Sequence, residues 1–209
     1  MKLYYATGTC SLSPHIVALE ADILLELERV EIRNTPHVTE SGADFRIVNP
    51  NGYVPALRLD DGSMLIEGVA IVQYLAEQKP EAWLAPPVAT PEHYHFLSWL
   101  NFIATELHKM FSPWLFHPEY GACAQEVARR KLAERLCFVE GQLGARGPHL
   151  LGEPFTAADA YLFTVASWSK FTNVSLEAFP RLRAFLERVA ARPTVRQALQ
   201  LHAAPTFGV

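Results

Sequence analysis

The N-terminal part of the chain (1–79) alternates short strand-like apolar runs with helix-like periods. The strand-like runs are 3–5, 27–32, 54–59 and 63–66. The last two flank an Asp-Asp-Gly sequence that is typical of a hairpin turn. Helical periodicity begins at Ser13, an N-cap residue, with Pro14 in the first helical position, and it returns over 67–78. The order strand–helix–strand, then strand–strand–helix, predicts an α/β domain with a mixed four-stranded sheet.

A proline-rich segment separates this part from the rest of the chain. Four of the fifteen prolines lie between Pro80 and Pro91. Proline fixes φ, removes an amide donor and disfavours helix in the residue before it, so this segment is predicted to be a linker. We therefore expect one domain over 1–79, a linker over 80–91 and a second domain over 92–209.

After the linker, the remaining patterns are helical. Helical periodicity covers 93–111, 126–143, 157–169 and 181–191. Thr156 and Asp159 have the spacing of a capping box, and Pro180 and Pro193 stand where helices would begin. Pro113 is expected to kink or end the first long helix. The second domain is therefore predicted to be all-helical.

Composition and charge narrow the classes of function. Half of the residues are hydrophobic, 19% are charged, and the formal net charge is −4, so there is no electrostatic reason to expect nucleic acid or an anionic membrane as a partner. No apolar run is long enough for a membrane span or a secretory core. Cys10, Cys123 and Cys137 make a poor disulfide framework and suit a reducing compartment. We expect a soluble, cytoplasmic protein.

Cys10 is the strongest candidate for a reactive side chain. It lies in the string CSLS, between the first predicted strand and the first predicted helix. A thiol near a helix N-terminus feels the positive end of the helix dipole and unpaired amides, and both favour the thiolate. The C-x-x-S spacing allows a mixed disulfide but no internal one. The alternative is a buried, inert cysteine, which is the interpretation we adopt for Cys123 and Cys137.

Two further motifs offer the polar groups that a peptide-like ligand needs. In NPNGYVPAL, a cis bond before Pro55 would turn the backbone groups of Val54 outward for pairing with such a ligand, and the alternative is a plain turn. Glu67 and Gly68 begin a predicted helix, whose first amides attract a carboxylate while the Glu67 carboxylate attracts an ammonium group. A zwitterionic amino-acid end would satisfy both, and the alternative is an ordinary helix-favouring glutamate.

The predicted helix over 93–111 carries a polar stripe. Its members are Asn101, Thr105 and His108 at i, i+4 and i+7, with Glu106 and Lys109 alongside. Because the same helix also carries many large apolar side chains, the stripe either faces a cleft or forms a solvated surface. The histidine pair within 93–95 cannot present both rings on one helical face, so no metal site is expected.

Five strings of the sequence together carry a family resemblance. In chain order they are MKLYYATGTCSLSPHI, NPNGYVPALRLDDG, LIEGVAIVQYLAE, WLNFIATELHK and FTAADAYLFTV. They span nearly the whole chain, and the combination resembles the glutathione S-transferases, most closely the bacterial beta class. The resemblance implies a thioredoxin-like N-terminal domain, an all-helical C-terminal domain and a homodimer. It also implies glutathione as co-substrate, bound in the cleft between the domains, and no metal.

The resemblance also implies roles for individual residues. Cys10 is similar to the glutathione-facing cysteine of the class, Val54 before Pro55 to the residue that pairs with the cysteinyl backbone, and Glu67 to the ligand of the γ-glutamyl ammonium group. The helix residues expected to bind glutathione, some of them reaching the partner subunit, are Asn101, Thr105, Glu106, His108 and Lys109. Cys10 and His108 are the expected catalytic residues.

Two positions depart from the family pattern. Gly68 stands where the family usually has serine or threonine, so one hydroxyl hydrogen bond to the γ-glutamyl carboxylate is missing, worth about 0.5–1.5 kcal/mol. His37 lies in the region where relatives often carry a lysine for the glycyl carboxylate, and a neutral histidine is a weaker and pH-dependent partner. Both residues are expected in the glutathione site.

The main functional hypothesis is an enzyme that conjugates glutathione to hydrophobic electrophiles, with the bound thiolate as nucleophile. The alternative is a glutathione-dependent thiol–disulfide oxidoreductase that acts through a Cys10 mixed disulfide. A non-catalytic association module is disfavoured, because it has no need of Cys10, Pro55 and Glu67 together. Aromatic residues expected either in an electrophile pocket or in the core are Tyr5, Phe111, Trp114, Trp168 and Phe171.

Overall fold

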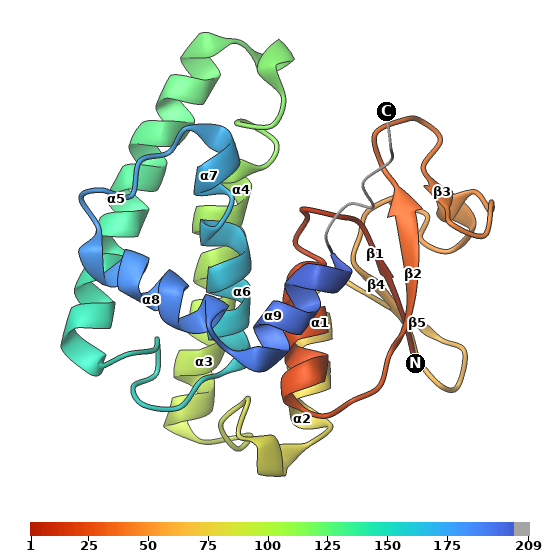
Figure 1. Ribbon diagram of the computed structural model, residues 1–209, viewed down its shortest axis with the longest axis horizontal. Coiled ribbons are helices and arrows are strands. Elements are labelled where there is room, and N and C mark those ends of the chain that lie inside the picture. Colours follow the sequence, from red (N-terminus) through yellow and green to blue (C-terminus); the bar gives the residue numbers. More distant parts are fainter. Residues whose placement is uncertain (203–209) are drawn as a thin grey trace. The chain divides into compact units, whose positions relative to one another are not determined.

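The computed structural model describes residues 1–202, and the chain forms two compact units (Figure 1). Unit 1 contains residues 1–82 and, after a return of the chain, the described residues from Arg192 onward. Unit 2 contains residues 83–191. The change from unit 1 to unit 2 falls within the segment 80–91 that the prolines mark as a linker.

The last described helix belongs to unit 1, although the sequence places it in the helical domain (92–209). Helix α9 (Pro193–Leu201) packs against α1 (Leu12–Glu20). The Arg192 guanidinium donates two hydrogen bonds of 2.6 Å to the Glu20 carboxylate, a directional, charge-assisted pair. Unit 2 therefore ends earlier than the expected domain, because helical periodicity does not reveal the surface on which a helix packs.

Unit 1 is built on a mixed sheet with the strand order β3-β2-β1-β4-β5. The strands are β1 (Lys2–Tyr5), β2 (Glu26–Glu31), β3 (Val38–Thr39), β4 (Ala56–Arg58) and β5 (Met64–Ile66), with 3₁₀ turns η1 (Phe45–Ile47) and η2 (Pro80–Ala82). β1 pairs parallel with β2 and antiparallel with β4, and β4 and β5 form the predicted hairpin. The predicted count of four strands is wrong. The fifth strand, β3, has only two residues and is too short to leave an alternating pattern.

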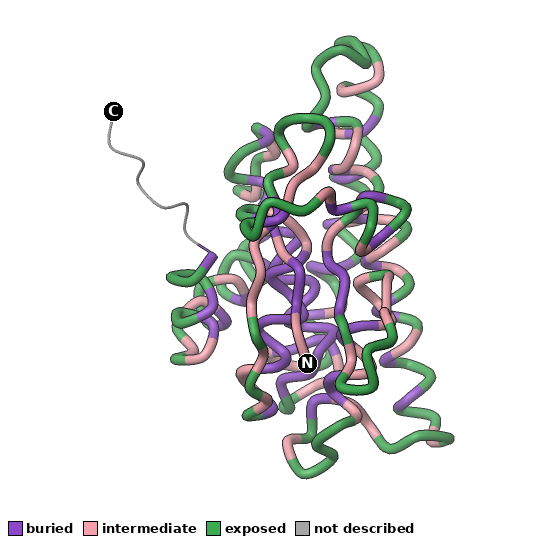
Figure 2. The backbone as a smooth tube through the Cα atoms, turned by 90° about the vertical axis from the view of Figure 1, so that its right-hand side faces the viewer, coloured by how far each residue is buried: buried purple, intermediate pink, exposed green. Residues whose placement is uncertain are grey.

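Helices α1 and α2 (Gly68–Glu77) contact each other and lie on one side of the sheet (Figure 1). β1, the strand that begins at the N label in Figure 2, is buried or half-buried along its length. The predicted N-cap at Ser13 is wrong, because α1 already begins at Leu12. The Ser13 hydroxyl instead donates to the Cys10 carbonyl (2.8 Å), inside the first turn of the helix.

The regular elements of unit 2 are helices, as predicted. They are α3 (Pro91–Phe102), the π-helix η3 (Ile103–His108), α4 (Lys109–Phe111), the 3₁₀ turn η4 (Pro118–Tyr120), α5 (Ala122–Arg146), α6 (Ala157–Ala166), α7 (Ser169–Thr172) and α8 (Pro180–Ala190). The first helical run ends before Pro113, and Pro180 lies in the first turn of α8, as predicted. The π-helix leaves no sequence signal, because six residues with i→i+5 bonding resemble an α-helical period. None of the helices in the described part of the chain is long and apolar enough to cross a membrane.

Two buried carboxylates fix helix starts in unit 2. Asp159 accepts a hydrogen bond from the Thr156 amide (2.8 Å) and so completes the predicted capping box of α6. Glu140, on α5, accepts from the amides of Arg181 and Leu182 at 3.0 and 2.9 Å, and it thereby caps α8 from a different helix. This second cap joins residues about 40 positions apart, so no local pattern predicts it.

Candidate functional site

The turn after β1 holds Cys10 at the start of α1. The hydroxyl of Ser11, the N-cap residue, accepts from the Ala6 amide (3.1 Å) and lies 2.7 Å from the Thr9 hydroxyl, so short-range bonds close the turn. Cys10 is half-buried, and its Sγ lies 3.5 Å from the Val54 carbonyl oxygen. The dipole and first amides of α1 favour an anionic sulfur at this end. A fully buried, inert cysteine does not fit this position.

The peptide bond between Val54 and Pro55 is cis, as the family resemblance implied, and the alternative of a plain turn is wrong. It follows a turn that is held by the buried residue Asn49, whose side-chain amide donates to the Tyr53 carbonyl (2.7 Å). The side-chain oxygen of Asn49 accepts a backbone amide two residues further on (3.1 Å). The sequence analysis missed Asn49 as a supporting residue, although an asparagine that organises its own turn is a recognisable signal.

Glu67 and Gly68 begin α2 beside the cis proline. A Cβ atom added to Gly68 would lie 3.7 Å from Cγ of Pro55, so the start of the helix packs directly on the proline ring. Glu67 is exposed and has φ 71° and ψ 117°, a conformation that is rare for a residue with a side chain and is enriched at functional sites. Its carbonyl accepts from the Ile71 amide (3.0 Å), so the helix itself holds this conformation.

These contacts bring three separate motifs into one group within unit 1. The Cys10 thiol contacts the Val54 carbonyl, and Pro55, the next residue, contacts Gly68 at the start of α2. The group contains a thiol at a helix start, backbone polar groups beside a cis proline, and a carboxylate next to the first amides of a helix. Together these features can bind an extended peptide-like ligand that carries an amino-acid end.

His37 lies beside the turn that precedes the cis proline. Its Nδ1 is 2.9 Å from the Gly52 carbonyl oxygen, and because a carbonyl only accepts, Nδ1 carries the hydrogen. A Cβ on Gly52 (φ 70°) would lie 3.9 Å from both His37 and Arg46, so Arg46 is a second basic neighbour that the sequence analysis did not identify.

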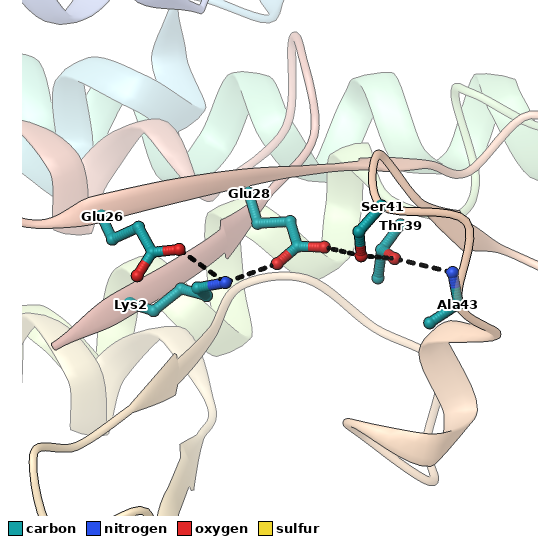
Figure 3. A network of polar contacts seen from close by, with 6 residues as sticks. All are labelled: Lys2, Glu26, Glu28, Thr39, Ser41 and Ala43. Atoms are coloured by element: carbon teal, nitrogen blue, oxygen red, sulfur yellow. Dashed lines mark hydrogen bonds and ion pairs between the residues drawn. The ribbon is translucent and has the colours of Figure 1, made fainter.

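A polar network ties the segment after His37 to the sheet (Figure 3). Lys2 Nζ pairs with Glu26 (2.6 Å) and Glu28 (2.8 Å), and the second oxygen of Glu28 accepts from the Ser41 hydroxyl (2.5 Å). Hydrogen bonds from Lys2 and Ser41 lower the pKa of Glu28 to about 2, so this carboxylate is ionised at neutral pH. The network therefore anchors the turn after β3, close in sequence to His37.

In unit 2, the predicted polar stripe falls partly on the π-helix. Exposed Asn101 donates to the Leu97 carbonyl (2.8 Å), and exposed Thr105 donates to the Asn101 carbonyl (3.0 Å), so both side chains bond to their own helix. Glu106 pairs with Arg135 of α5 at 2.6 Å, and its carboxylate is thus engaged within unit 2.

The stripe does not behave as one α-helical face. The π-helical i→i+5 bonding changes the angular spacing after residue 103, so the expected i, i+4, i+7 alignment of Asn101, Thr105 and His108 does not apply. Lys109, at the start of α4, is exposed. Among the described residues, no group of three or more His, Cys, Asp or Glu side chains is placed to hold a metal ion.

His108 is held by aromatic residues of unit 2. Its Nδ1 lies 2.7 Å from the Tyr161 hydroxyl, and its ring meets the Trp168 ring edge-on at 4.9 Å between centroids. Burial, aided by the nearby charge of Lys109, lowers the pKa of His108 to about 4. The imidazole is therefore neutral at pH 7 and acts as a hydrogen-bonding group, not as a cation.

The five aromatic candidates for an electrophile pocket differ in burial. Phe111 is fully buried and packs edge-on against Trp168, which is 5% exposed, so the structure places both in the core of unit 2 and not on an open wall. Trp114 and Phe171 remain exposed. Tyr5, in unit 1, is half-buried, with its ring 4.5 Å from that of His202.

Unit 1 is a thioredoxin-like α/β unit with a cysteine at a helix start and a neighbouring cis proline, and a helical unit follows it in the chain. This combination defines the glutathione transferase class of folds. Residues 8–78 match the family described as "Glutathione S-transferase, N-terminal domain", and residues 102–193 match "Glutathione S-transferase, C-terminal domain". The chain belongs to the glutathione S-transferase family.

Particular relatives agree with this assignment. The chain is 44% identical to glutathione S-transferase GstA of Escherichia coli O157:H7 over 95% of this chain and 97% of the relative. It is 33% identical to glutathione S-transferase GST-4.5 of Xanthomonas campestris, and the match covers 96% of this chain and 98% of that relative.

Solved structures extend the similarity to the bacterial beta class. The ternary complex of the bacterial transferase BphK is 48% identical with a TM-score of 0.93, covering 97% of this chain and 99% of that one. A sphingomonad glutathione S-transferase complexed with glutathione is 37% identical and has a TM-score of 0.92. The match covers 98% of this chain and 100% of that one. The beta-class enzyme of Sphingomonas chungbukensis is 38% identical with a TM-score of 0.91, also covering 98% and 100%. The resemblance to the beta class is thereby confirmed.

Proposed function

We propose that this chain conjugates glutathione to hydrophobic electrophiles. The observation that carries the proposal is the group in unit 1 where the Cys10 thiol, the backbone of Val54 and the start of α2 at Glu67 are linked through the cis proline. The relatives support it, since two carry the name glutathione S-transferase and the sphingomonad structure contains glutathione. These names also favour conjugation over the alternative, disulfide exchange.

Each part of glutathione has a matching group in unit 1. The cysteinyl backbone pairs with Val54, which lies outside β4. The γ-glutamyl ammonium binds the Glu67 carboxylate, and the γ-glutamyl carboxylate binds the first amides of α2 at Gly68. The glycyl carboxylate lies towards His37, and Arg46, the basic neighbour of His37 around Gly52, supplies a permanent positive charge there.

The chemistry is a nucleophilic attack by the sulfur of glutathione. The thiolate is the reactive form, so binding must lower the pKa of that thiol. The α1 dipole favours negative charge near Cys10, beside which the sulfur of glutathione is proposed to bind. A carbon–sulfur bond forms while the leaving group departs with its electron pair, or while a conjugated double bond accepts the pair and is then protonated.

A panel of electrophiles tests the activity. Recombinant protein, glutathione and aryl halides, enones or epoxides are incubated together, and conjugates are quantified by mass spectrometry against the uncatalysed reaction. We expect acceleration with at least one class. Glu67→Gln keeps the size and backbone of the side chain but removes its charge, and the loss of a hydrogen bond to a charged group, about 1.5–3 kcal/mol, raises the Kd for glutathione roughly tenfold or more.

The matched control for this variant is Glu81→Gln, an exposed carboxylate of unit 1 outside the site, which should leave glutathione binding unchanged. Acceleration of none of the electrophiles would overturn the proposed function. Unchanged glutathione affinity in Glu67→Gln by calorimetry would instead remove Glu67 from the site.

Cys10→Ala separates conjugation from disulfide exchange. We expect the variant to lose glutathione-dependent reduction of a mixed-disulfide substrate and to keep measurable conjugation, because conjugation uses the thiol of glutathione itself. Cys123 and Cys137 are exposed, so the buried position expected for them is wrong, and both are accessible to oxidised glutathione. The mass measurement is therefore made with both replaced by serine. In that background the protein should gain one glutathione through Cys10, and the Cys10→Ala variant none. Full reductase activity in Cys10→Ala would show that Cys10 is not the reactive thiol.

We also propose a homodimer in the cytoplasm. Trp99 and Phe102 of α3 form an aromatic cluster with Phe138 of α5, and Phe138 is 49% exposed, which supports a protein contact at this surface. The small number of cysteines fits a reducing compartment. Light scattering should give about twice 23.4 kDa, and Phe138→Glu should lower the mass towards that of one chain. A single-chain mass for the unaltered protein at micromolar concentration would exclude the dimer.

A further inference from the structure

A short hairpin over residues 37–45 of unit 1 links two basic residues. The Phe45 amide donates to the His37 carbonyl (2.9 Å), so His37 stands at the open end of the hairpin, and Arg46 directly follows the hairpin in the chain. Both side chains come close to one point, because a Cβ atom added to Gly52 would lie 3.9 Å from each of them. The open end of the hairpin therefore presents two basic groups to the turn that precedes the cis proline.

The closed end of the hairpin is fixed to the sheet by one carboxylate (Figure 3). Glu28 of β2, whose side chain is 12% exposed, accepts from the Ser41 hydroxyl (2.5 Å) and pairs with Lys2 of β1 (2.8 Å). The Thr39 hydroxyl lies 3.0 Å from the Ser41 hydroxyl and accepts from the Ala43 amide (3.1 Å). These side-chain contacts hold the closed end from the sheet and from within the turn.

This anchor matters because the backbone ladder at this edge of the sheet is short. The strand β3 has two residues, and its register with β2 consists of two residue pairs. One further backbone bond runs from the Glu40 amide to the Arg29 carbonyl (2.7 Å). A hydrogen bond to an ionised carboxylate is shorter and stronger than a neutral one, so the bond from Ser41 to Glu28 restricts the hairpin more than the short ladder does alone.

We propose that Glu28 is a positioning residue that, through the hairpin 37–45, fixes His37 and Arg46 for the glycyl carboxylate of glutathione. As a result, the protein selects glutathione over γ-glutamylcysteine, the same compound without its glycyl residue. The inference rests on the proposed function, in which the glycyl carboxylate lies towards these two basic groups. Charged donors that are held in place before the ligand arrives lose less freedom on binding. A loosened hairpin should therefore weaken only the part of the binding that the glycyl end supplies.

Ser41→Ala removes the anchoring hydroxyl at an exposed position. We expect the Kd for glutathione, measured by calorimetry, to rise about two- to tenfold, the value of one net hydrogen bond, and the Kd for γ-glutamylcysteine to stay unchanged. Glu28→Gln keeps the size of the side chain but removes its charge, and it should cause the same selective loss. Ser41→Thr keeps a hydroxyl and should preserve the original ratio of the two Kd values.

Ser63→Ala is the matched control. Ser63 is also an exposed turn serine of unit 1, and its hydroxyl donates to the Asp61 carboxylate (2.6 Å), away from the hairpin 37–45. This variant should leave both Kd values unchanged. The path from the anchor to the ligand is tested in a protein that carries His37→Ala and Arg46→Ala. In that background, Ser41→Ala should no longer change the Kd for glutathione, because the groups that the anchor positions are gone.

The two ligands separate this inference from the proposed function. If the unaltered protein binds neither of them, the proposed function fails, and the inference fails with it. If it binds both equally, the glutathione site stands and only the positioning role is overturned. An unchanged ratio of the two Kd values in Ser41→Ala would also overturn the inference, because the hydroxyl would then have a general structural role. So would an equal loss of glutathione affinity from Ser41→Ala with and without the two basic side chains.

Discussion

Gly68 offers the most direct test of how the start of α2 binds the γ-glutamyl carboxylate. Gly68→Ser introduces the hydroxyl that the family usually has at this position. The structure has room for it, because a Cβ at Gly68 meets only Pro55 Cγ at 3.7 Å and Cδ at 3.9 Å, both ordinary contacts, and Gly68 does not have a left-handed φ. The substitution therefore adds a donor at the helix start without moving the cis proline.

The expected gain is that of one hydrogen bond. A net 0.5–1.5 kcal/mol corresponds to a Kd for glutathione about two- to twelvefold lower. Gly68→Ala is the matched control, since it adds the same Cβ and the same change in backbone entropy but no hydroxyl. Isothermal titration calorimetry of the three proteins at one pH and salt concentration measures the difference.

The comparison between serine and alanine decides the result. A lower Kd for Gly68→Ser than for Gly68→Ala supports a carboxylate at the start of α2. Equal Kd values for the two variants would refute the reasoning, because the hydroxyl would then have no ligand group within reach. A higher Kd for both would show that the added Cβ blocks the ligand at this position.

Two further predictions concern stability. Burial lowers the pKa of His15 to about 4 and that of His202 to about 3, so between pH ~6.5 and ~4 the unfolded chain binds more protons than the folded one. Stability therefore falls as the pH falls through this window, by up to about 1.4 kcal/mol per pH unit for each group, and His15→Gln should flatten the pH dependence seen in urea denaturation. An equally steep dependence in the variant would contradict this. Glu140→Ala leaves two amides of α8 unpaired and should cost about 1–3 kcal/mol for each, whereas Glu134→Ala, at an exposed surface pair of the same helix, should cost less than about 1 kcal/mol. Equal losses in thermal denaturation would show that the cap does not stabilise α8.

The sequence by itself determined the features that depend on near neighbours along the chain. The Asp-Gly hairpin, the capping box of Thr156 and Asp159, and the helix start at Pro180 were all predicted from residues a few positions apart. The cis bond before Pro55 does not belong to this group, because the residues alone allow either isomer and only the family resemblance implied the cis form. The family resemblance added candidate site residues, yet it did not say what each of them contacts.

Tertiary structure alone decided the contacts between distant segments. These include the 3.5 Å approach of the Cys10 thiol to Val54, the packing of Gly68 on the cis proline, and the pairing of His108 with Tyr161. The fifth strand and the attachment of α9 to unit 1 belong here too. The physical reason is the same in each case. A helical or strand pattern shows which face of an element is apolar, but the partner that covers this face, and the polar atoms that meet there, depend on the packing of the whole chain.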